Sequence, residues 1–210
     1  MGGHLENPKG TISMFAHLRP AIALTLLFAL LTGLAYPLAM TGIAQTLFPR
    51  AANGSLIEAD GAIVGSALIA QPFAGEGYLQ PRPSASGWNA AGTGASNLGP
   101  TSAGLIAAVA ERRAAWEAAN GAPAPIDAVT TSGSGLDPDI SPENALAQAG
   151  RIAAARGAEP EAVRVLIAAA TRPAFLGLYG APRVNVLLTN IALDDAFPMP
   201  PAAGEGQATE

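Results

Sequence analysis

The sequence predicts an α+β protein, in which a single N-terminal transmembrane helix is followed by a mixed α/β extracytoplasmic domain. Three observations predict this class. An uncharged, mostly apolar run extends from Pro20 to Pro49. Further along, alanine-rich segments typical of helices alternate with short β-branched runs typical of strands. The 24 glycines and 18 prolines among 210 residues divide the chain into short elements.

The apolar run predicts a transmembrane helix over residues 19–48. A helix rises about 1.5 Å per residue, so about 20 apolar residues cross a hydrocarbon core about 30 Å thick. Pro37 removes one backbone hydrogen bond and is expected to kink this helix. Small residues such as Gly33 and Gly42 favour close contact with another helix. A cleaved signal peptide is the alternative, although its apolar region is usually only about 7–15 residues long.

The charges around the run predict its orientation. Lys9, Arg19 and both histidines precede it, whereas Arg50 is soon followed by Glu58 and Asp60. Because positive residues favour the cytoplasmic side, residues 1–18 are expected to be a cytoplasmic tail. Residues 49–195 are then expected to form the extracytoplasmic domain.

The first part of that domain predicts a hairpin and a helix joined by a long loop. Asp60-Gly61 lies between two β-rich runs, which is typical of a hairpin turn. Residues 80–100 are rich in Gly, Ser, Asn and Pro and are expected to form an irregular loop. A helix is expected to begin at Thr101 or Ser102 and to end at Gly121.

The second part predicts two helices and two strands. Residues 122–131 are expected to lead into a short strand, and one helix is expected from Pro142 to about Arg156. A further helix is expected from Pro160 to just before Pro173. The β-branched and apolar residues of 183–193 favour a closing strand. The Pro-, Ala- and Gly-rich residues 196–210 are expected to be disordered.

The stretch VTTSGSGLDPDISPENA, residues 129–145, is the candidate site. Ser141 before Pro142 predicts a helix N-cap. The preceding Gly/Ser loop exposes backbone N–H groups that could bind an anion. However, a phosphate-binding P-loop needs a lysine after its last glycine, and Leu136 and Asp137 stand there instead. A structural turn and a ligand loop both stay open. If the loop binds a ligand, the residues expected to contact it are Ser132, Gly133, Ser134, Gly135 and Gln148.

Catalytic chemistry has few candidates in this domain. Both histidines, His4 and His17, precede the apolar run, so no serine of the domain has a histidine base. The acid pairs Asp137/Asp139 and Asp194/Asp195 fit helix caps or solvated faces as well as acid–base work. The absence of cysteine excludes thiolate sites, and a net charge of −5 argues against nucleic-acid binding.

Several motifs, taken together and in order, resemble one family. They are LRPAIALTLLFALLTGLAYPLAMTGIAQTLFP, NGSLIE, VGSALIAQPF, RPSASGWN, GASNLGPT, TTSGSGLDPDISPENA and PRVNVLLTNIALD. Across residues 18–194 the chain resembles the C subunit of the bacterial Kdp potassium-transporting ATPase, a P-type ATPase complex.

The resemblance implies an accessory subunit of an ATP-driven, high-affinity K+ importer in the bacterial inner membrane. Its implied partners are the channel-like, K+-binding subunit, the P-type pump subunit, the small fourth subunit of the same complex and membrane lipid, with no nucleic acid. The resemblance also implies a catalytic chaperone that raises the ATP affinity of the pump subunit. ATP is the implied cofactor, carried by Ser132, Gly133, Ser134, Gly135 and Gln148, with no metal and no catalytic residue of the chain's own.

The expected topology conflicts with this ATP role, because it places the Gly/Ser loop where free ATP is absent. Three hypotheses therefore stay open. The chain is an assembly subunit, a membrane-tethered nucleotide- or anion-binding module using residues 131–136, or an exported enzyme. The lack of histidine in the domain weighs against the third.

Overall fold

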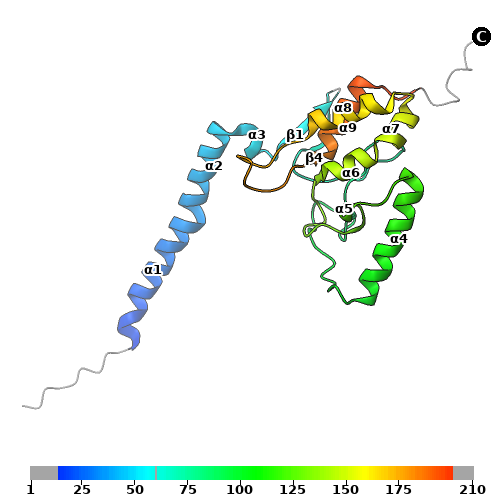
Figure 1. Cartoon of the computed structure of the whole chain (residues 1–210). Helices are drawn as coiled ribbons and strands as arrows, with labels where there is room; N and C mark the ends of the chain where they lie inside the picture. Colours follow the sequence, from blue (N-terminus) through cyan, green and yellow to red (C-terminus); the bar gives the residue numbers. More distant parts are fainter. Residues whose placement is uncertain (1–13, 60, 201–210) are drawn as a thin grey trace, which may run out of the picture. The chain divides into compact units, whose positions relative to one another are not determined.

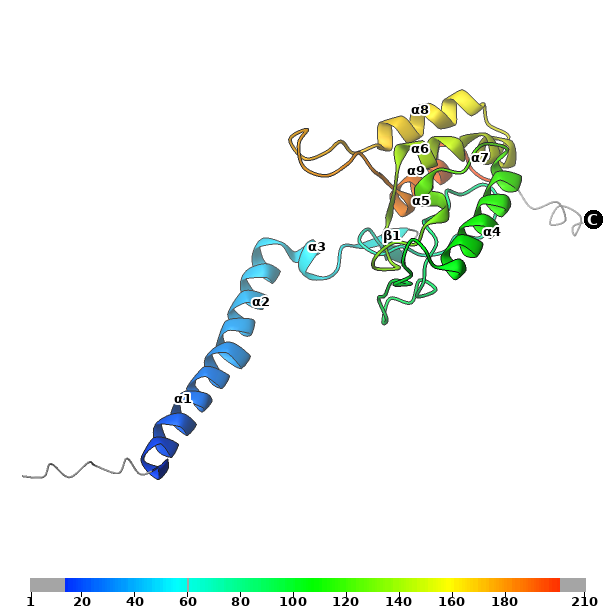
Figure 2. The same ribbon diagram turned by 60° about the horizontal axis from the view of Figure 1, so that its bottom comes forward.

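The computed structural model describes residues 14–59 and 61–200. The chain divides after Gly54 into an N-terminal helical unit and a C-terminal domain that begins at Ser55. Helices and short strands alternate along the domain (Figures 1 and 2), so the predicted α+β class is confirmed.

The N-terminal unit is a long apolar helix. Its parts in chain order are η1 (Met14–His17), α1 (Leu18–Leu30), the π-helical turn η2 (Leu31–Ala35), α2 (Tyr36–Leu47) and α3 (Pro49–Ala52). From α1 to α2 it runs for 30 residues, none of them buried. At about 1.5 Å per residue this length is about 45 Å, more than a hydrocarbon core of about 30 Å. The helix is therefore long and apolar enough to cross a membrane.

The disturbance expected at Pro37 takes the form of a widened turn. Because proline has no N–H and its ring crowds the preceding turn, a regular helix cannot continue through it. The π-helical turn η2 ends immediately before α2, and the Tyr36 N–H bonds the Leu31 carbonyl five residues back. In the same region the Thr32 hydroxyl donates to the Phe28 carbonyl at 2.6 Å.

The domain opens with the predicted hairpin. Strand β1 (Leu56–Ala59) pairs antiparallel with β2 (Ala62–Ser66), and Ala59 lies opposite Ala62. Gly61 has a φ of +77°, which glycine adopts without strain. Asp60, the other residue of the expected turn, lies outside the described residues.

The long loop and the helix after it are also confirmed. Residues 80–100 contain no helix or strand. Helix α4 (Ala103–Asn120) follows, with Ser102 at its N-cap. Gly121 ends the helix with a left-handed φ of +64°, a common glycine helix stop.

The prediction that a short strand directly follows residues 122–131 is wrong. That segment forms a four-residue helix, α5 (Ile126–Val129), because Pro125 precedes it in an extended conformation and Asp127 lies in its first turn. The next strand, β3 (Asp139–Ile140), comes later and pairs antiparallel with β4 (Val184–Asn185).

The helix expected from Pro142 to Arg156 is broken at Gln148. The structure has α6 (Pro142–Ala147) and α7 (Ala149–Arg156), followed by α8 (Pro160–Ala170) as predicted. At the break the Gln148 N–H bonds the Ala145 carbonyl, three residues back, at 3.2 Å. This tighter turn separates the two helices.

The strand expected over residues 183–193 is wrong. Only β4 is extended there, and α9 (Val186–Ala196) follows. Asn185 caps this helix, since its side chain accepts the Leu188 N–H at 3.1 Å. The buried residues of α9 recur with helical spacing rather than alternating, which explains the outcome; they are Val186, Leu187, Thr189, Asn190 and Leu193.

The core lies among α6, α7, α8 and α9, which pack together in Figures 1 and 2. Loop residue Leu79, fully buried, joins it. The other core side chains are Ile140, Ala145, Ala149, Ile152, Ala153, Val163, Ile167, Val184, Val186 and Leu193. The tail expected to be disordered at 196–210 is ordered at its start, because Ala196 ends α9 and Phe197 packs against this core. Residues 201–210 lie outside the described part of the chain.

Candidate functional site

The Gly/Ser loop forms two consecutive turns closed by its own serines. The Ser132 hydroxyl accepts the Gly135 N–H at 2.8 Å, and the Ser134 hydroxyl accepts the Leu136 N–H at 3.0 Å. Ser132 and Gly135 are buried, whereas Gly133 and Ser134 are exposed. Only the middle of the loop is therefore accessible to a ligand.

Residues of the long loop, 80–100, hydrogen-bond to this Gly/Ser turn. The Ser84 hydroxyl donates to the Gly135 carbonyl at 2.6 Å, and the Gly94 N–H and the Thr93 hydroxyl each donate to the Ser134 carbonyl at 2.8 Å. Gly135 has a φ of +70°, and a Cβ added there would lie 2.8 Å from the Gly94 carbonyl oxygen. Glycine is therefore strongly favoured at this position.

The acids after the turn are both paired with arginines. Arg82 from the long loop lies 3.2 Å from the Asp137 carboxylate, and Arg183 lies 3.0 Å from the Asp139 carboxylate. Arg82 also donates to the carbonyls of Thr130 and Thr131. These pairs offset the negative charge that the sequence places beside the loop, so repulsion of an anion is weaker than expected.

Ser141 caps α6 as predicted, with help from Asp127. The Ser141 hydroxyl accepts the Asn144 N–H at 3.0 Å. The Asp127 carboxylate in turn accepts the Ser141 N–H at 2.7 Å and its hydroxyl at 3.0 Å. The sequence did not reveal this role of Asp127, because residues 122–131 were expected only to lead into a strand and not to form a helix.

Gln148 is buried, at 1% exposure, and its amide bonds the long loop rather than the Gly/Ser turn. Its oxygen accepts the Gln80 N–H at 2.8 Å, and its nitrogen donates to the Gln80 carbonyl at 3.3 Å. The same amide also donates to Asn144 at 2.9 Å and accepts from Arg151 at 2.7 Å. None of the hydrogen bonds described for Gln148 reaches residues 132–135.

Asn190 of α9 holds the neighbouring residue in the same way. Its oxygen accepts the Leu79 N–H at 2.8 Å, and its nitrogen donates to the Leu79 carbonyl at 3.1 Å. Two side-chain amides thus pair with the backbones of successive residues, Leu79 and Gln80. We call Gln148 and Asn190 together the amide clamp. It fixes the start of the long loop onto the helices.

Two arginines hold the same segment from α7. Arg151 donates to the carbonyls of Glu76 and Tyr78, and Arg156 donates to the Gly77 carbonyl at 2.7 Å. Arg156 also lies over the Tyr78 ring, 4.9 Å from its centroid. Burial lowers the pKa of the Arg151 guanidinium, and the Glu76 charge partly opposes this. Residues 76–80 are therefore held largely through their main-chain groups.

Similarity to known proteins decides the family. A model of the c chain of the K+-transporting ATPase matches residues 18–195. A potassium-transporting ATPase KdpC subunit from Cereibacter sphaeroides is 67% identical over 183 residues, covering 87% of this chain and 99% of that relative. KdpC subunits from Rhodospirillum rubrum and Caulobacter vibrioides are each 54% identical, over 89% and 88% of this chain and 99% and 96% of those relatives.

The chain belongs to the KdpC family. The resemblance inferred from the motifs is thereby confirmed, and the chain is a KdpC subunit of the K+-transporting Kdp ATPase. Membership in this family implies a membrane complex with the other Kdp subunits, consistent with the long apolar helix.

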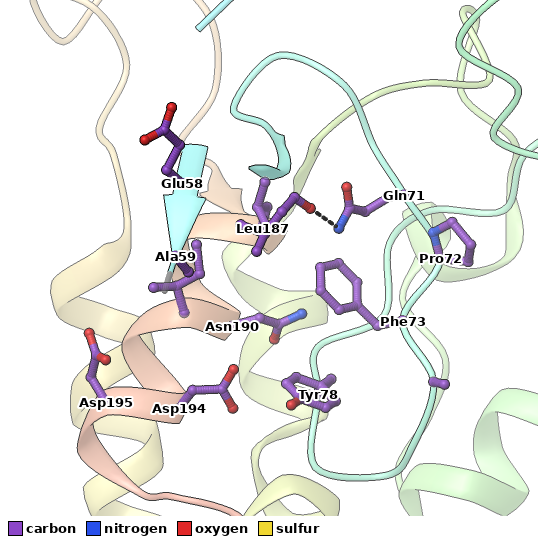
Figure 3. Close-up of a pocket in the computed structure, with 13 residues that line it drawn as sticks. Glu58, Ala59, Gln71, Pro72, Phe73, Tyr78, Leu187, Asn190, Asp194 and Asp195 are labelled. Carbon is purple, nitrogen blue, oxygen red and sulfur yellow. Dashed lines mark hydrogen bonds between the residues drawn. The ribbon is translucent and has the colours of Figure 1, made fainter. Parts of the chain in front are cut away.

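The domain has a cavity of about 630 Å³, and the second acid pair of the sequence, Asp194 and Asp195, lines it (Figure 3). Phe73, Tyr78 and Leu187 form its apolar wall. Asp194 and Asp195 lie along one edge, at the end of α9. Asp194 is bound by Arg156 at 2.8 Å, so it serves the fold. Within the described residues, no group of three His, Asp or Glu side chains converges as a metal site would require.

Proposed function

We propose that this KdpC chain is the non-catalytic accessory subunit of an ATP-driven K+ importer and stabilises the assembly of that complex from outside the cytoplasm. Its partners are the channel-like K+-binding subunit, the P-type pump subunit and the small fourth subunit. One observation carries the proposal: the polar groups that an active site would use are occupied within the domain. Gln148, Asn190, Arg151 and Arg156 all hold residues 76–80 in place. This arrangement suits a preformed docking body.

The charge pattern supports an extracytoplasmic domain, because Lys9 and Arg19 lie toward the N-terminal end of the apolar helix, whereas Arg50 at its other end is followed by Glu58 and Asp60. A thiol tests this directly, because the chain has no cysteine of its own. Ser134→Cys lies at an exposed position and should react with a membrane-impermeant maleimide in intact cells. Ser13→Cys, before the helix, is the matched control and should react only after lysis. The reverse pattern would reject the proposed placement.

The chain raises the ATP affinity of the pump subunit through this docking, because an extracytoplasmic domain cannot touch cytoplasmic ATP. Its effect reaches the ATP site through the other subunits, as a coupling free energy between distant sites. The complex reconstituted with the chain should therefore have a lower KM for ATP than the complex without it. An equal KM in two preparations with matched subunit content would exclude the chaperone role.

Direct nucleotide binding is the second candidate function, with ATP held by Ser132, Gly133, Ser134, Gly135 and Gln148. The observation that favours it is the exposed middle of the Gly/Ser loop. None of the hydrogen bonds described within the domain uses the N–H of Gly133 or Ser134, and the nearby acids are paired with arginines. Two adjacent free N–H groups are a feature of anion-binding loops.

Equilibrium dialysis of ATP against the full chain in detergent separates the two candidates. Gly133→Val should weaken binding if the loop holds the nucleotide. Gly99→Val is the matched control, because an added Cβ meets nothing within 4 Å at either glycine. Equal affinity of both variants and the unchanged chain would remove the loop from nucleotide binding. The topology result with Ser134→Cys does not depend on this outcome.

A further inference from the structure

A loop of the domain exposes four large apolar side chains together. It follows α8 and projects from the helices as the orange loop in Figure 2. We call residues 173–182 the apolar hairpin. They include no charged residue. The exposed fractions are 68% for Phe175, 75% for Leu176, 81% for Leu178 and 69% for Tyr179. A cluster of this kind marks an interaction site more often than an ordinary surface.

The hairpin has a defined backbone. At its base, Arg172 and Arg183 exchange two main-chain hydrogen bonds of 2.8 and 3.0 Å. Nearer the tip, Phe175 and Tyr179 exchange two more, of 2.9 and 3.0 Å. The apolar side chains are therefore presented by an ordered turn, and their exposure does not come from a frayed segment.

These backbone contacts suit a nonpolar environment. The N–H groups of Gly177 and Leu178 bond the carbonyls of Ala174 and Phe175 at 3.0 and 3.1 Å. Backbone groups that enter lipid need such internal partners, because lipid offers none. The tip therefore meets much of that requirement before it touches another surface.

The side chains match the boundary between lipid and water. Tyr and Phe are favoured at the level of the lipid headgroups, and Leu favours the acyl chains just beneath. Arg172 and Arg183, both exposed, flank the base of the apolar hairpin, where Arg183 is paired with Asp139. An arginine at the position of Arg172 approaches lipid phosphates while its stem covers apolar surface.

The tether between the apolar helix and the domain is short. The apolar helix ends at Leu47 and the domain begins at Ser55. Residues 48–54, at about 3.3–3.6 Å each, span at most about 25 Å even when fully extended. Because residues 49–52 are helical, the real reach is shorter. Ser55, at the start of the domain, therefore stays within about 25 Å of the end of the apolar helix.

We propose that the tip of the apolar hairpin inserts into the interfacial layer of the bilayer that the apolar helix crosses. The domain then has two membrane attachments, the helix and the hairpin. The second attachment limits rotation of the domain about its tether and fixes which face it presents to a partner. This inference concerns a contact with lipid and does not depend on the role proposed for the chain in the complex.

Site-specific labelling of the full chain in vesicles tests the insertion. The Leu178→Cys variant is labelled at its thiol with the environment-sensitive fluorophore NBD. It is then placed in vesicles of phosphatidylcholine and phosphatidylglycerol that also contain quencher lipids with nitroxide-labelled acyl chains. Ile126→Cys is the matched control, since Ile126 is an equally prominent apolar residue, 80% exposed, outside the hairpin. The label at residue 178 should emit at shorter wavelength and be quenched several-fold more strongly by the nitroxide lipids. Adding Phe175→Asp should abolish the difference.

Two outcomes would overturn the proposal. In the first, both labels are quenched equally by aqueous iodide and neither by nitroxide lipids, so that the hairpin stays in water. In the second, the label at residue 178 becomes shielded only when the other subunits of the complex are added, without quenching by nitroxide lipids. The hairpin would then be a protein-docking element.

Discussion

Replacing Gln148 by leucine should destabilise the domain through the loss of the amide clamp. The substitution nearly keeps side-chain volume but removes four hydrogen bonds, to Gln80 N–H, the Gln80 carbonyl, Asn144 and Arg151. A buried polar group left without a partner costs about 1–3 kcal/mol, and of these partners the Arg151 guanidinium retains other bonds. We therefore expect a loss of about 3 kcal/mol, a large share of a typical domain stability of about 5–15 kcal/mol.

Urea unfolding of the full chain in mild detergent measures this loss. Trp88 and Trp116 report on the domain, since the apolar helix contains no tryptophan. Gln71→Leu is the matched control, because Gln71 donates a single half-buried hydrogen bond to the Val64 carbonyl at 3.0 Å. It should lose about 1 kcal/mol. Hydrogen exchange should also accelerate at the amides of residues 79 and 80.

The same variant separates a structural role from a ligand role for Gln148. If Gln148→Leu unfolds at the same urea concentration as Gln71→Leu, the assignment of its amide to the fold is wrong. An unchanged unfolding midpoint together with weaker ATP binding would return Gln148 to the nucleotide site expected from the family resemblance.

Two further substitutions test the loop and its cap. Gly135→Ala should cost about 1–3 kcal/mol in thermal or urea unfolding, because its φ of +70° and the nearby Gly94 carbonyl oppose a Cβ. Gly133→Ala, with open space around it, is the control, and an equal loss there would contradict the packing argument. Ser141→Ala should cost about 1 kcal/mol by removing the α6 cap, whereas Ser141→Thr keeps the hydroxyl and should retain most of the capping bond to Asn144 and the bond to Asp127. Equal stability of the two Ser141 variants would contradict that cap.

The elements that the sequence predicts are those defined by local chemistry. The uncharged run after Arg19 predicts a long helix because length and composition alone define a membrane-spanning segment. Ser141-Pro142 predicts a helix start because a cap needs only neighbouring residues. Asp60-Gly61 predicts a hairpin for the same reason.

The elements that it misses depend on distant contacts. Residues 183–193 alternate like a strand, yet their burial against the other helices and the Asn185 cap make α9 a helix. The amide clamp joins residues 68 and 111 positions apart, so no local pattern reveals it. The apolar hairpin had a weak local signal, an uncharged run between Arg172 and Arg183, but sequence alone does not separate an exposed run from a buried one.

The shared bonds between the long loop and the Gly/Ser turn have a mechanical consequence. Thr93 and Gly94 are tied to the Ser134 carbonyl, and Ser84 to the Gly135 carbonyl. A force applied to either segment must therefore stretch these bonds or drag the other segment along. The two surface loops are therefore expected to move together. A neighbouring protein that binds one of them would also displace the residues leading into α6.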